Sequence, residues 1–316
     1  VKWSARVRLA GAHHPKPLWS LLVLGRRRAM LRLALLLCSL TSTAAVRRLL
    51  VTGANKGIGK AICAAALQQH PDVHVLLGSR DATRGKRAIQ SIVEAAPDCE
   101  GRIEMLTIDV ADSESVAAAA KEVKTKYGTD ALFGLCNNAG IGFGKGFGPT
   151  LATNYYGTRN VCEAFLPLMS SGGRVVNIAS ASAPMFVAAC PADQRAVFTD
   201  PAVTLDAIEE VLSKYQGAMD YANDAYGLSK ACVNAYTRIL AREHPALTIN
   251  SCTPGFILTD LTMGMGATNP PEKGTGAPLY CLLGDVQGSG CYYGSDSQRS
   301  PLDRYRAPGD PPYKGH

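Results

Sequence analysis

The sequence predicts an α/β fold, in which a parallel sheet of about seven strands is covered by helices on both faces. The main observation is that apolar strand-like runs alternate with helix-like patterns along most of the 316 residues, an order typical of βαβ units. In addition, turns rich in glycine and polar residues follow the strand-like runs, where parallel sheets bind their ligands. With 47% hydrophobic residues, the chain can bury such a sheet in one domain.

The first strand-like run, Leu49 to Val51, leads into a glycine-rich turn over residues 52–59 and then into a helical pattern. Gly53 allows a sharp exit from the strand, and Gly57 and Gly59 remove Cβ atoms that would collide with a phosphate or with the sheet. Such a turn points a helix N-terminus at a pyrophosphate. The spacing is G-x-x-x-G-x-G, which differs from the commoner dinucleotide motif.

The remaining elements continue the alternation. Further strands are expected at residues 73–78, 103–108, 131–136, 174–179, 247–252 and, as a short last strand, 290–294. Helices are expected at residues 81–95, 221–243 and 271–283. One further helix is expected to begin at residue 112, and another, after the glycine-rich loop 142–148, to end near residue 169. Residues 181–220 are expected to be irregular, apart from one helical pattern at 205–215. The end, 299–316, is rich in Pro, Gly and Arg and is expected to run over the surface.

Charge is distributed unevenly along the chain. The formal net charge is +7, but ten basic residues and no acidic ones occur in residues 1–48. The remainder carries 23 basic and 26 acidic residues. The basic character therefore belongs to the N-terminal segment, and the domain itself is not expected to bind nucleic acid.

Residues 1–46 are expected to be a leader, followed by one domain over 47–294 and a C-terminal tail over 295–316. From Met30, a basic residue, an apolar run over 33–40 and small residues up to Ala45 resemble a secretory signal. An organelle transit peptide, or an upstream part that is not translated, remains an alternative. The apolar runs are too short to form a stable membrane span. The domain otherwise looks cytosolic, so the compartment stays open.

Cysteine and histidine do not form a recognisable site. The ten cysteines fall mostly in helical or strand-like runs, and C-x-x-C and H-E-x-x-H spacings are absent from the sequence. We therefore expect reduced, mostly buried cysteines and no metal.

Tyr226 and Lys230 form the second informative pattern. They are four residues apart in a helical pattern and therefore share one face. A lysine ammonium next to a phenol favours the phenolate and lowers the tyrosine pKa. Such a pair can protonate a carbonyl oxygen, or remove a proton in the reverse direction. An exposed Tyr and Lys on an amphipathic helix is the alternative when this spacing is taken alone.

The sequence resembles the short-chain dehydrogenase/reductase family, and most of all its NADPH-dependent carbonyl reductase branch. The matching stretches, in family order over about residues 47–294, are TGANKGIG (52–59), NNAG (137–140), TNYYGT (153–158), RVVNIAS (174–180), YGLSK (226–230) and PGFILTD (254–260). The resemblance implies a Rossmann-type doubly wound sheet.

The resemblance also implies a role for each matching position. Tyr226 would be the proton donor and Lys230 would lower its pKa and bind the nicotinamide ribose. Ser180 would hold the substrate carbonyl, and Asn154 would hold a water linked to Lys230. The cofactor would contact Gly53, Asn55, Lys56, Gly57, Ile58, Gly59, Arg80, Asp109, Asn138, Tyr226, Lys230, Pro254, Gly255, Ile257 and Thr259.

The end of the second strand indicates which cofactor is used. NAD enzymes place a carboxylate there for the ribose 2′-hydroxyl, whereas this chain has Gly78, Ser79 and Arg80. Arg80 and Lys56 can flank a 2′-phosphate, which favours NADPH. The alternative makes Asp81 the ribose ligand and Arg80 a surface charge.

Two segments differ in length from simple members of the family. Ser180 and Tyr226 are 46 positions apart, and the long insertion resembles the helix that covers the usual oligomer surface, which favours a monomer. Asn138 and Asn154 are only 16 positions apart, which leaves the wall of the substrate pocket in doubt.

The leading hypothesis is NADPH-dependent reduction of a ketone, aldehyde or quinone. An alcohol dehydrogenase that works in the oxidative direction, and a non-catalytic regulator that binds NADP(H), are the alternatives. The natural substrate cannot be inferred from these motifs.

Overall fold

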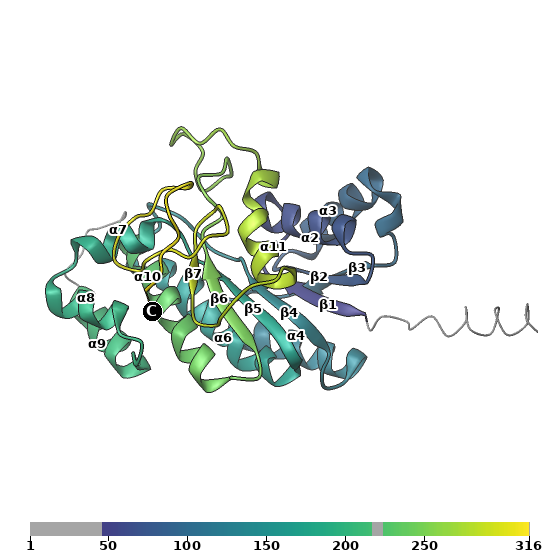
Figure 1. Ribbon diagram of the computed structural model, residues 1–316. Helices are drawn as coiled ribbons and strands as arrows, with labels where there is room; N and C mark the ends of the chain where they lie inside the picture. The colour runs from purple at the N-terminus through teal and green to yellow at the C-terminus, as the bar shows by residue number, and fades with distance from the viewer. Residues whose placement is uncertain (1–45, 217–223, 316) are drawn as a thin grey trace, which may run out of the picture. The chain divides into compact units, whose positions relative to one another are not determined.

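The computed structural model describes residues 46–216 and 224–315, and these contain a seven-stranded parallel sheet (Figure 1). The spatial order is β3-β2-β1-β4-β5-β6-β7. The expected doubly wound fold is therefore confirmed. The strands are β1 (Arg47–Val51), β2 (Val73–Ser79), β3 (Ile103–Thr107), β4 (Leu132–Asn137), β5 (Met169–Ile178), β6 (Thr248–Cys252) and β7 (Tyr292–Tyr293).

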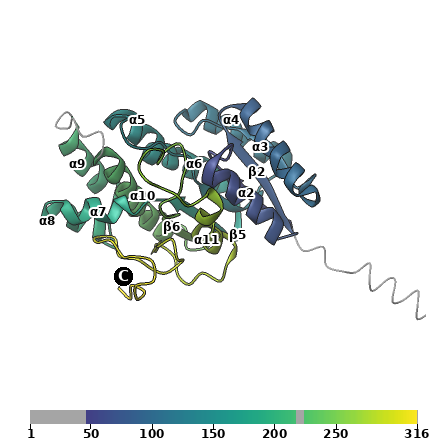
Figure 2. The same cartoon turned by 90° about the horizontal axis from the view of Figure 1, so that it is seen from above.

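Helices connect the strands and cover both faces of the sheet. Seen from above, α2 and α11 lie over the sheet, whereas α7, α8 and α9 lie at the opposite end from α3 (Figure 2). The helices are α2 (Gly57–Gln69), α3 (Ala82–Ala95), α4 (Ser113–Tyr127), α5 (Phe147–Leu151), α6 (Gly157–Phe165), α7 (Ser182–Ala189), α8 (Ala192–Thr199), α9 (Leu205–Tyr215), α10 (Asp224–Glu243) and α11 (Gly276–Leu283), with short turns η1 (Pro97–Cys99), η2 (Ala152–Tyr156), η3 (Leu166–Leu168) and η4 (Pro271–Gly274).

The core forms two layers, one on each face of the sheet. Leu49 and Val51 of β1 point into the layer made with α2, α3 and α11, and Leu50 points into the layer made with α4, α6 and α10. This is the two-residue alternation of a strand that is buried on both faces. Strand order reverses between β1 and β4, so the crevice for ligands opens at their carboxyl ends.

The insertion after Ser180 is more regular than the sequence predicts. The expectation of an irregular segment was wrong for residues 182–189 and 192–199, which form α7 and α8. Both are only eight residues long, so local pattern alone identifies them poorly. They form because Val187 and Phe198 are buried against the rest of the layer with α10. The monomeric state stays a prediction.

The C-terminal segment was expected to run over the surface, and this was wrong for part of it. The segment folds back on β7, where the Ser300 amide donates to the Tyr292 carbonyl at 2.8 Å. Ser300 is buried, and the Arg306 side chain is only 6% exposed. Their burial comes from ion pairing and backbone pairing, which composition does not reveal.

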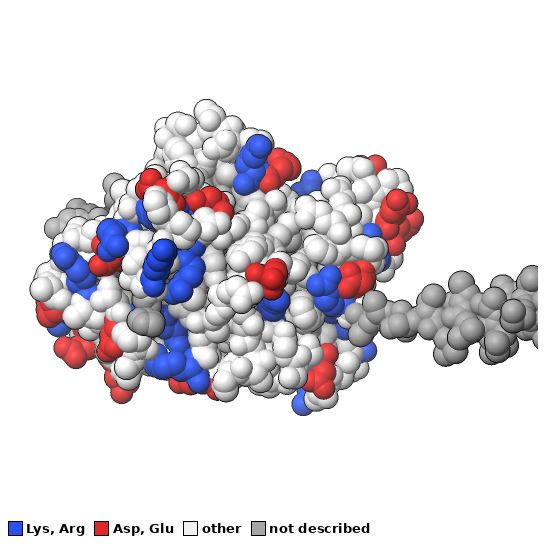
Figure 3. All heavy atoms as spheres, viewed as in Figure 1, with Lys and Arg blue, Asp and Glu red and all other residues white. Residues whose placement is uncertain are grey.

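The predicted leader lies outside the described residues, apart from Val46. Between residue 46 and residue 315, leaving out 217–223, no helix is long and apolar enough to cross a membrane. The nine described cysteines are free thiols, and eight of them are buried. On the face shown in Figure 3, acidic side chains accompany the basic ones, consistent with the balanced charge expected for the domain.

Candidate active site

The glycine-rich turn packs tightly against the loop after β4. Gly53 and Gly57 have φ angles of 63° and 55°, which side chains rarely adopt. A Cβ on Gly53 would lie 2.8 Å from the Cα of Ala139, and a Cβ on Gly59 would lie 2.4 Å from Nδ2 of Asn138. The glycines are thus required by protein packing as well as by any phosphate. Asn138 fixes the contact by donating from Nδ2 to the Thr52 carbonyl at 2.9 Å.

Asn154 lies within a π-helical turn, η2, that interrupts the helix after α5. Such turns are often found at functional sites. Its Oδ1 accepts from the Ile141 amide at 2.9 Å, and its Nδ2 donates to the Ile141 carbonyl and to Ser229 Oγ, both at 3.0 Å. Asn154 therefore clamps the start of the glycine-rich loop 141–146. A Cβ on Gly140 would meet both Asn154 Oδ1 and Lys230 Nζ, so these two groups are neighbours.

The structure brings Ser180, Tyr226 and Lys230 together, as the sequence predicts. Tyr226 and Lys230 lie on α10 and are 7% and 4% exposed, so they are not solvent-facing surface residues. The Ser180 hydroxyl lies close enough to the Tyr226 phenol to affect its pKa. Lys230 Nζ donates to the Ile178 carbonyl at 2.7 Å and lies 5.8 Å from the centre of the Tyr226 ring. A phenol, a hydroxyl and an ammonium thus converge at the end of β5.

The protonation tendencies of this cluster differ from the simplest expectation. Burial lowers the pKa of Lys230 to about 8. Burial also raises the pKa of Tyr226, and the hydrogen bond from Ser180 opposes that rise. The expected net lowering of the Tyr226 pKa by Lys230 was therefore wrong for this state, because desolvation is the larger effect. The consequence is a protonated phenol at neutral pH, which is the form that can donate a proton.

Phe143 is a neighbour of the cluster that the sequence did not single out. Its ring packs on Tyr226 with the ring centres 4.6 Å apart, within the range of favourable aromatic pairs. It lies between Gly142 and Gly144 in the loop that Asn154 clamps. A single Phe in a glycine-rich loop carries no signal in the sequence, so only the folded chain reveals this contact.

The two residues expected at the cofactor's 2′-phosphate are Arg80, which follows β2, and Lys56, in the glycine-rich turn after β1. Arg80 is 68% exposed, and its Nη1 lies 3.9 Å from Oδ2 of Asp109. Lys56 forms an ion pair with Asp260, which joins the glycine-rich turn to the loop after β6. These exposed pairs contribute little to stability, so both cations can exchange their partners for a phosphate.

Asp81, the alternative ribose ligand, has a structural role in the fold. It is the N-cap of α3, where Oδ1 accepts from the Arg84 amide at 2.9 Å, and Oδ2 pairs with Arg84 Nε at 2.6 Å. Both carboxylate oxygens are thus engaged at the helix N-terminus.

Replacing Asp81 with Ala is expected to reduce the free energy of unfolding by about 1 kcal/mol, because a helix loses its cap. The ratio of the KM values for NADPH and NADH should stay the same. Urea unfolding and steady-state kinetics measure the two effects. Asp112→Ala is the matched control, since Asp112 caps α4 through the Glu114 and Ser115 amides. A cofactor preference that shifts only in the Asp81 variant would instead support the ribose role.

The loop after β6 returns over the glycine-rich turn. Gly255 has a φ of 93°, and the Thr259 amide donates to Thr262 Oγ1 at 3.0 Å. A Cβ on Gly57 would lie 3.4 Å from Cγ2 of Thr259. The turn expected at the pyrophosphate and the residue expected at the nicotinamide carboxamide are thus neighbours.

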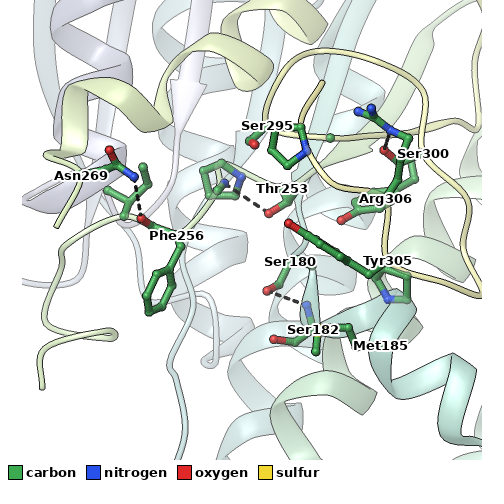
Figure 4. Close-up of a pocket in the computed structure, with 18 of the residues that line it drawn as sticks. Ser180, Ser182, Met185, Thr253, Phe256, Asn269, Ser295, Ser300, Tyr305 and Arg306 are labelled. Atoms are coloured by element: carbon green, nitrogen blue, oxygen red, sulfur yellow. Dashed lines mark hydrogen bonds between the residues drawn. The ribbon is translucent and has the colours of Figure 1, made fainter. Parts of the chain in front are cut away.

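A cavity of about 530 Å³ lies next to the Tyr226 cluster. Ser180 lines it (Figure 4). Pro254, Gly255 and Ile257 of the loop after β6 line it as well. Ser180 is the member of the Tyr226 cluster that lines the cavity. Ser180 was predicted to contact the substrate and the other three residues the cofactor, so the cavity has the composition expected of a site for both.

Comparison with known proteins relates this geometry to a family. Residues 47–192 match the family model described as short chain dehydrogenase. The chain is 34% identical over 257 residues to carbonyl reductase (NADPH) 1 of Homo sapiens, which covers 74% of this chain and 90% of that protein. The chain belongs to the short chain dehydrogenase family. It is therefore an oxidoreductase, as the motifs predict.

Two further relatives in the short chain dehydrogenase family show how far the likeness extends. The chain is 31% identical over 287 residues to (+)-neomenthol dehydrogenase of Arabidopsis thaliana, with 78% of this chain and 95% of that protein covered. The structure of menthone neomenthol reductase from Mentha piperita superposes with a TM-score of 0.66 at 28% identity, over 80% of this chain and 99% of that one.

One side of the cavity in this short chain dehydrogenase comes from residues that the sequence analysis missed. Tyr305 and Arg306 line it from the C-terminal segment, and Met185 lines it from α7. Figure 4 shows Tyr305 on the same side of the cavity as Ser300 and Arg306. The family motifs end before this segment, so motif matching could not have found these residues.

Proposed function

We propose that this short chain dehydrogenase reduces a small carbonyl compound to the alcohol with NADPH, with Tyr226 as the proton donor. The observation that carries the proposal is that the buried Tyr226 lies beside Lys230 and Ser180, and that Ser180 lines the cavity. The name of the human relative, carbonyl reductase (NADPH) 1, supports the reaction and the cofactor.

The residues divide the reaction between them. When bound, NADPH supplies the hydride that adds to the carbonyl carbon, and the C=O π electrons move to the oxygen. Tyr226 donates its proton to that oxygen, and the Ser180 hydroxyl holds the oxygen next to the phenol. The Lys230 ammonium stabilises the phenolate left on Tyr226, because opposite charges attract strongly in a buried site. The Asn154 clamp keeps the loop beside Lys230 in place.

The preference for NADPH rests on Arg80 and Lys56. The exposed guanidinium of Arg80 follows β2 directly, and Lys56 lies in the glycine-rich turn. Two carboxylates lie nearby. Asp81 is engaged at the N-terminus of α3 and with Arg84, and the 2′-phosphate would replace Asp109 as the partner of Arg80. Together the two cations provide a site for the 2′-phosphate that NADH lacks.

The test is the loss of absorbance at 340 nm with residues 46–316 and a panel of ketones, aldehydes and quinones. Turnover with NADPH well above turnover with NADH is expected. Arg80→Ala and Lys56→Ala should each raise the KM for NADPH about ten-fold and barely change the KM for NADH, since each loses a hydrogen bond to a charged group.

Lys60→Ala is the matched control for these variants, because Lys60 lies on α2 and binds Ser91. Its NADPH KM should be that of the unaltered protein. Equal use of NADH by the unaltered protein would contradict the cofactor assignment. Tight NADPH binding without any turnover would instead favour the alternative of a non-catalytic regulator that binds NADP(H).

A further inference from the structure

The C-terminal segment 294–308 forms a wall of the cavity that the motifs of the domain do not include. Gly294, Ser295, Ser300, Tyr305, Arg306 and Pro308 all line the cavity. In Figure 4 this wall faces the start of α7, where Ser182 and Met185 lie. A substrate that approaches Ser180 therefore passes between α7 and the C-terminal segment.

Arg306 braces the segment from within. Its guanidinium forms an ion pair with Asp296, and Nε donates to Ser300 Oγ at 3.0 Å. Its Nη1 donates to the Asp310 carbonyl at 2.7 Å, while the second oxygen of Asp296 accepts from the Gly309 amide at 3.1 Å. Since every guanidinium nitrogen has a partner, Arg306 is a structural brace and is not available to bind an anionic substrate.

Tyr305 lies next to this brace and exposes its ring to the cavity. It is 53% exposed, and Met185 and Phe256, which also line the cavity, are 58% and 51% exposed. Figure 4 shows the three side chains around the space next to Ser180. Large apolar side chains gain free energy when a ligand covers them, and their concentration at one concave site marks a surface for an apolar ligand.

We propose that Tyr305, held in place by the Asp296–Arg306 brace, is a specificity-determining residue that selects carbonyl substrates with an uncharged, apolar ring system. The ring of Tyr305 forms one wall, and Met185 and Phe256 contact the rest of the substrate. Small aliphatic carbonyl compounds have little apolar surface to place against this wall. This assignment rests on the proposed function, because it assumes reduction of a carbonyl at Ser180.

The experiment compares 9,10-phenanthrenequinone, a planar three-ring compound, with propanal as the small carbonyl compound. Tyr305→Ala is expected to lower the ratio of kcat/KM for phenanthrenequinone to kcat/KM for propanal by about ten-fold, because an aromatic contact and its buried area are lost. The loss should appear in KM. Tyr305→Phe retains the ring and should retain the ratio. Tyr313→Ala is the control, since Tyr313 follows this segment in the chain and does not line the cavity.

The brace is tested with Asp296→Asn, alone and together with Tyr305→Ala. If Asp296 acts by positioning Tyr305, Asp296→Asn should raise the KM for phenanthrenequinone and leave the KM for propanal unchanged. The double variant should then have the same kcat/KM for phenanthrenequinone as Tyr305→Ala. If the losses of kcat/KM in the two single variants add up in the double variant, or if Asp296→Asn lowers kcat/KM equally for both substrates, the brace has only a general structural role. An unchanged ratio in Tyr305→Ala would overturn the proposal itself.

A binding measurement separates this proposal from the proposed function. Phenanthrenequinone is titrated calorimetrically into protein saturated with NADP⁺, which cannot reduce it. Weaker binding to Tyr305→Ala than to the unaltered protein supports the role of Tyr305 in binding the ring system, even if no carbonyl is reduced. Absence of turnover would contradict only the proposed function. Equal binding to both proteins contradicts the wall, whatever the turnover.

Discussion

Tyr226→Phe is expected to lower kcat for carbonyl reduction by about 10³-fold, because a positioned general acid contributes roughly 10²- to 10⁴-fold to a rate. The substitution removes one oxygen atom. The aromatic ring, its burial and its packing on Phe143 all remain. The dissociation constant for NADPH should therefore change little. Stopped-flow absorbance at 340 nm measures the rate, and fluorescence of bound NADPH measures the affinity.

Tyr236→Phe is the matched control for this variant. Tyr236 lies on the same helix, α10, and is 3% exposed, but it packs in the core against Tyr155. Removal of the Tyr236 hydroxyl should leave kcat within about two-fold of the value for the unaltered protein, since this group lies away from the reacting atoms. If Tyr226→Phe retained a tenth or more of the activity, Tyr226 would not be the proton donor.

Lys230→Met is expected to abolish most turnover and yet to stabilise the protein. Burial lowers the Lys230 pKa from 10.5 to about 8. At pH 7 the folded protein holds a buried ammonium that the unfolded chain would hold in water, which costs about 3 kcal/mol for a shift of this size. Losing the hydrogen bond to the Ile178 carbonyl offsets about 1 kcal/mol. A gain of about 2 kcal/mol remains.

The pH dependence gives this prediction a sign. The folded-state pKa of Lys230 lies below the unfolded value, so the unfolded chain binds more protons between pH 8 and 10.5. The destabilising effect of Lys230 is therefore complete below about pH 8 and disappears as the pH rises to 10.5. Urea unfolding should give the Lys230→Met variant a larger free energy of unfolding than the original protein at pH 7, and nearly the same free energy at pH 10.

Lys121→Met, at an exposed position on α4, is the control and should change neither stability nor turnover. A Lys230 variant that is less stable than the original at pH 7 would show that the ammonium is well solvated or paired in the fold. Full activity in that variant would show that the phenolate of Tyr226 needs no neighbouring cation.

Much of the fold could be predicted because its signals are local. The run Leu49 to Val51 is apolar throughout, as expected of a strand buried on both faces, and Gly53 and Gly57 occupy the two left-handed positions of the turn that follows. By contrast, Val187 and Phe198 lie on helices of only two turns, α7 and α8, whose stability comes from packing against other elements. Such helices leave little periodicity in the sequence.

The sequence by itself determined the α/β architecture, the family and the Tyr226–Lys230 pair, because these depend on residue type and spacing along single elements, and the family resemblance added Ser180. Tertiary structure decided what surrounds that group. It buried Tyr226 and Lys230, so that desolvation set the direction of their pKa shifts. It also brought Phe143 and Tyr305 to the site from segments far apart in the chain. Contacts of this kind depend on distance in space, and the spacing of residues along the chain does not encode them.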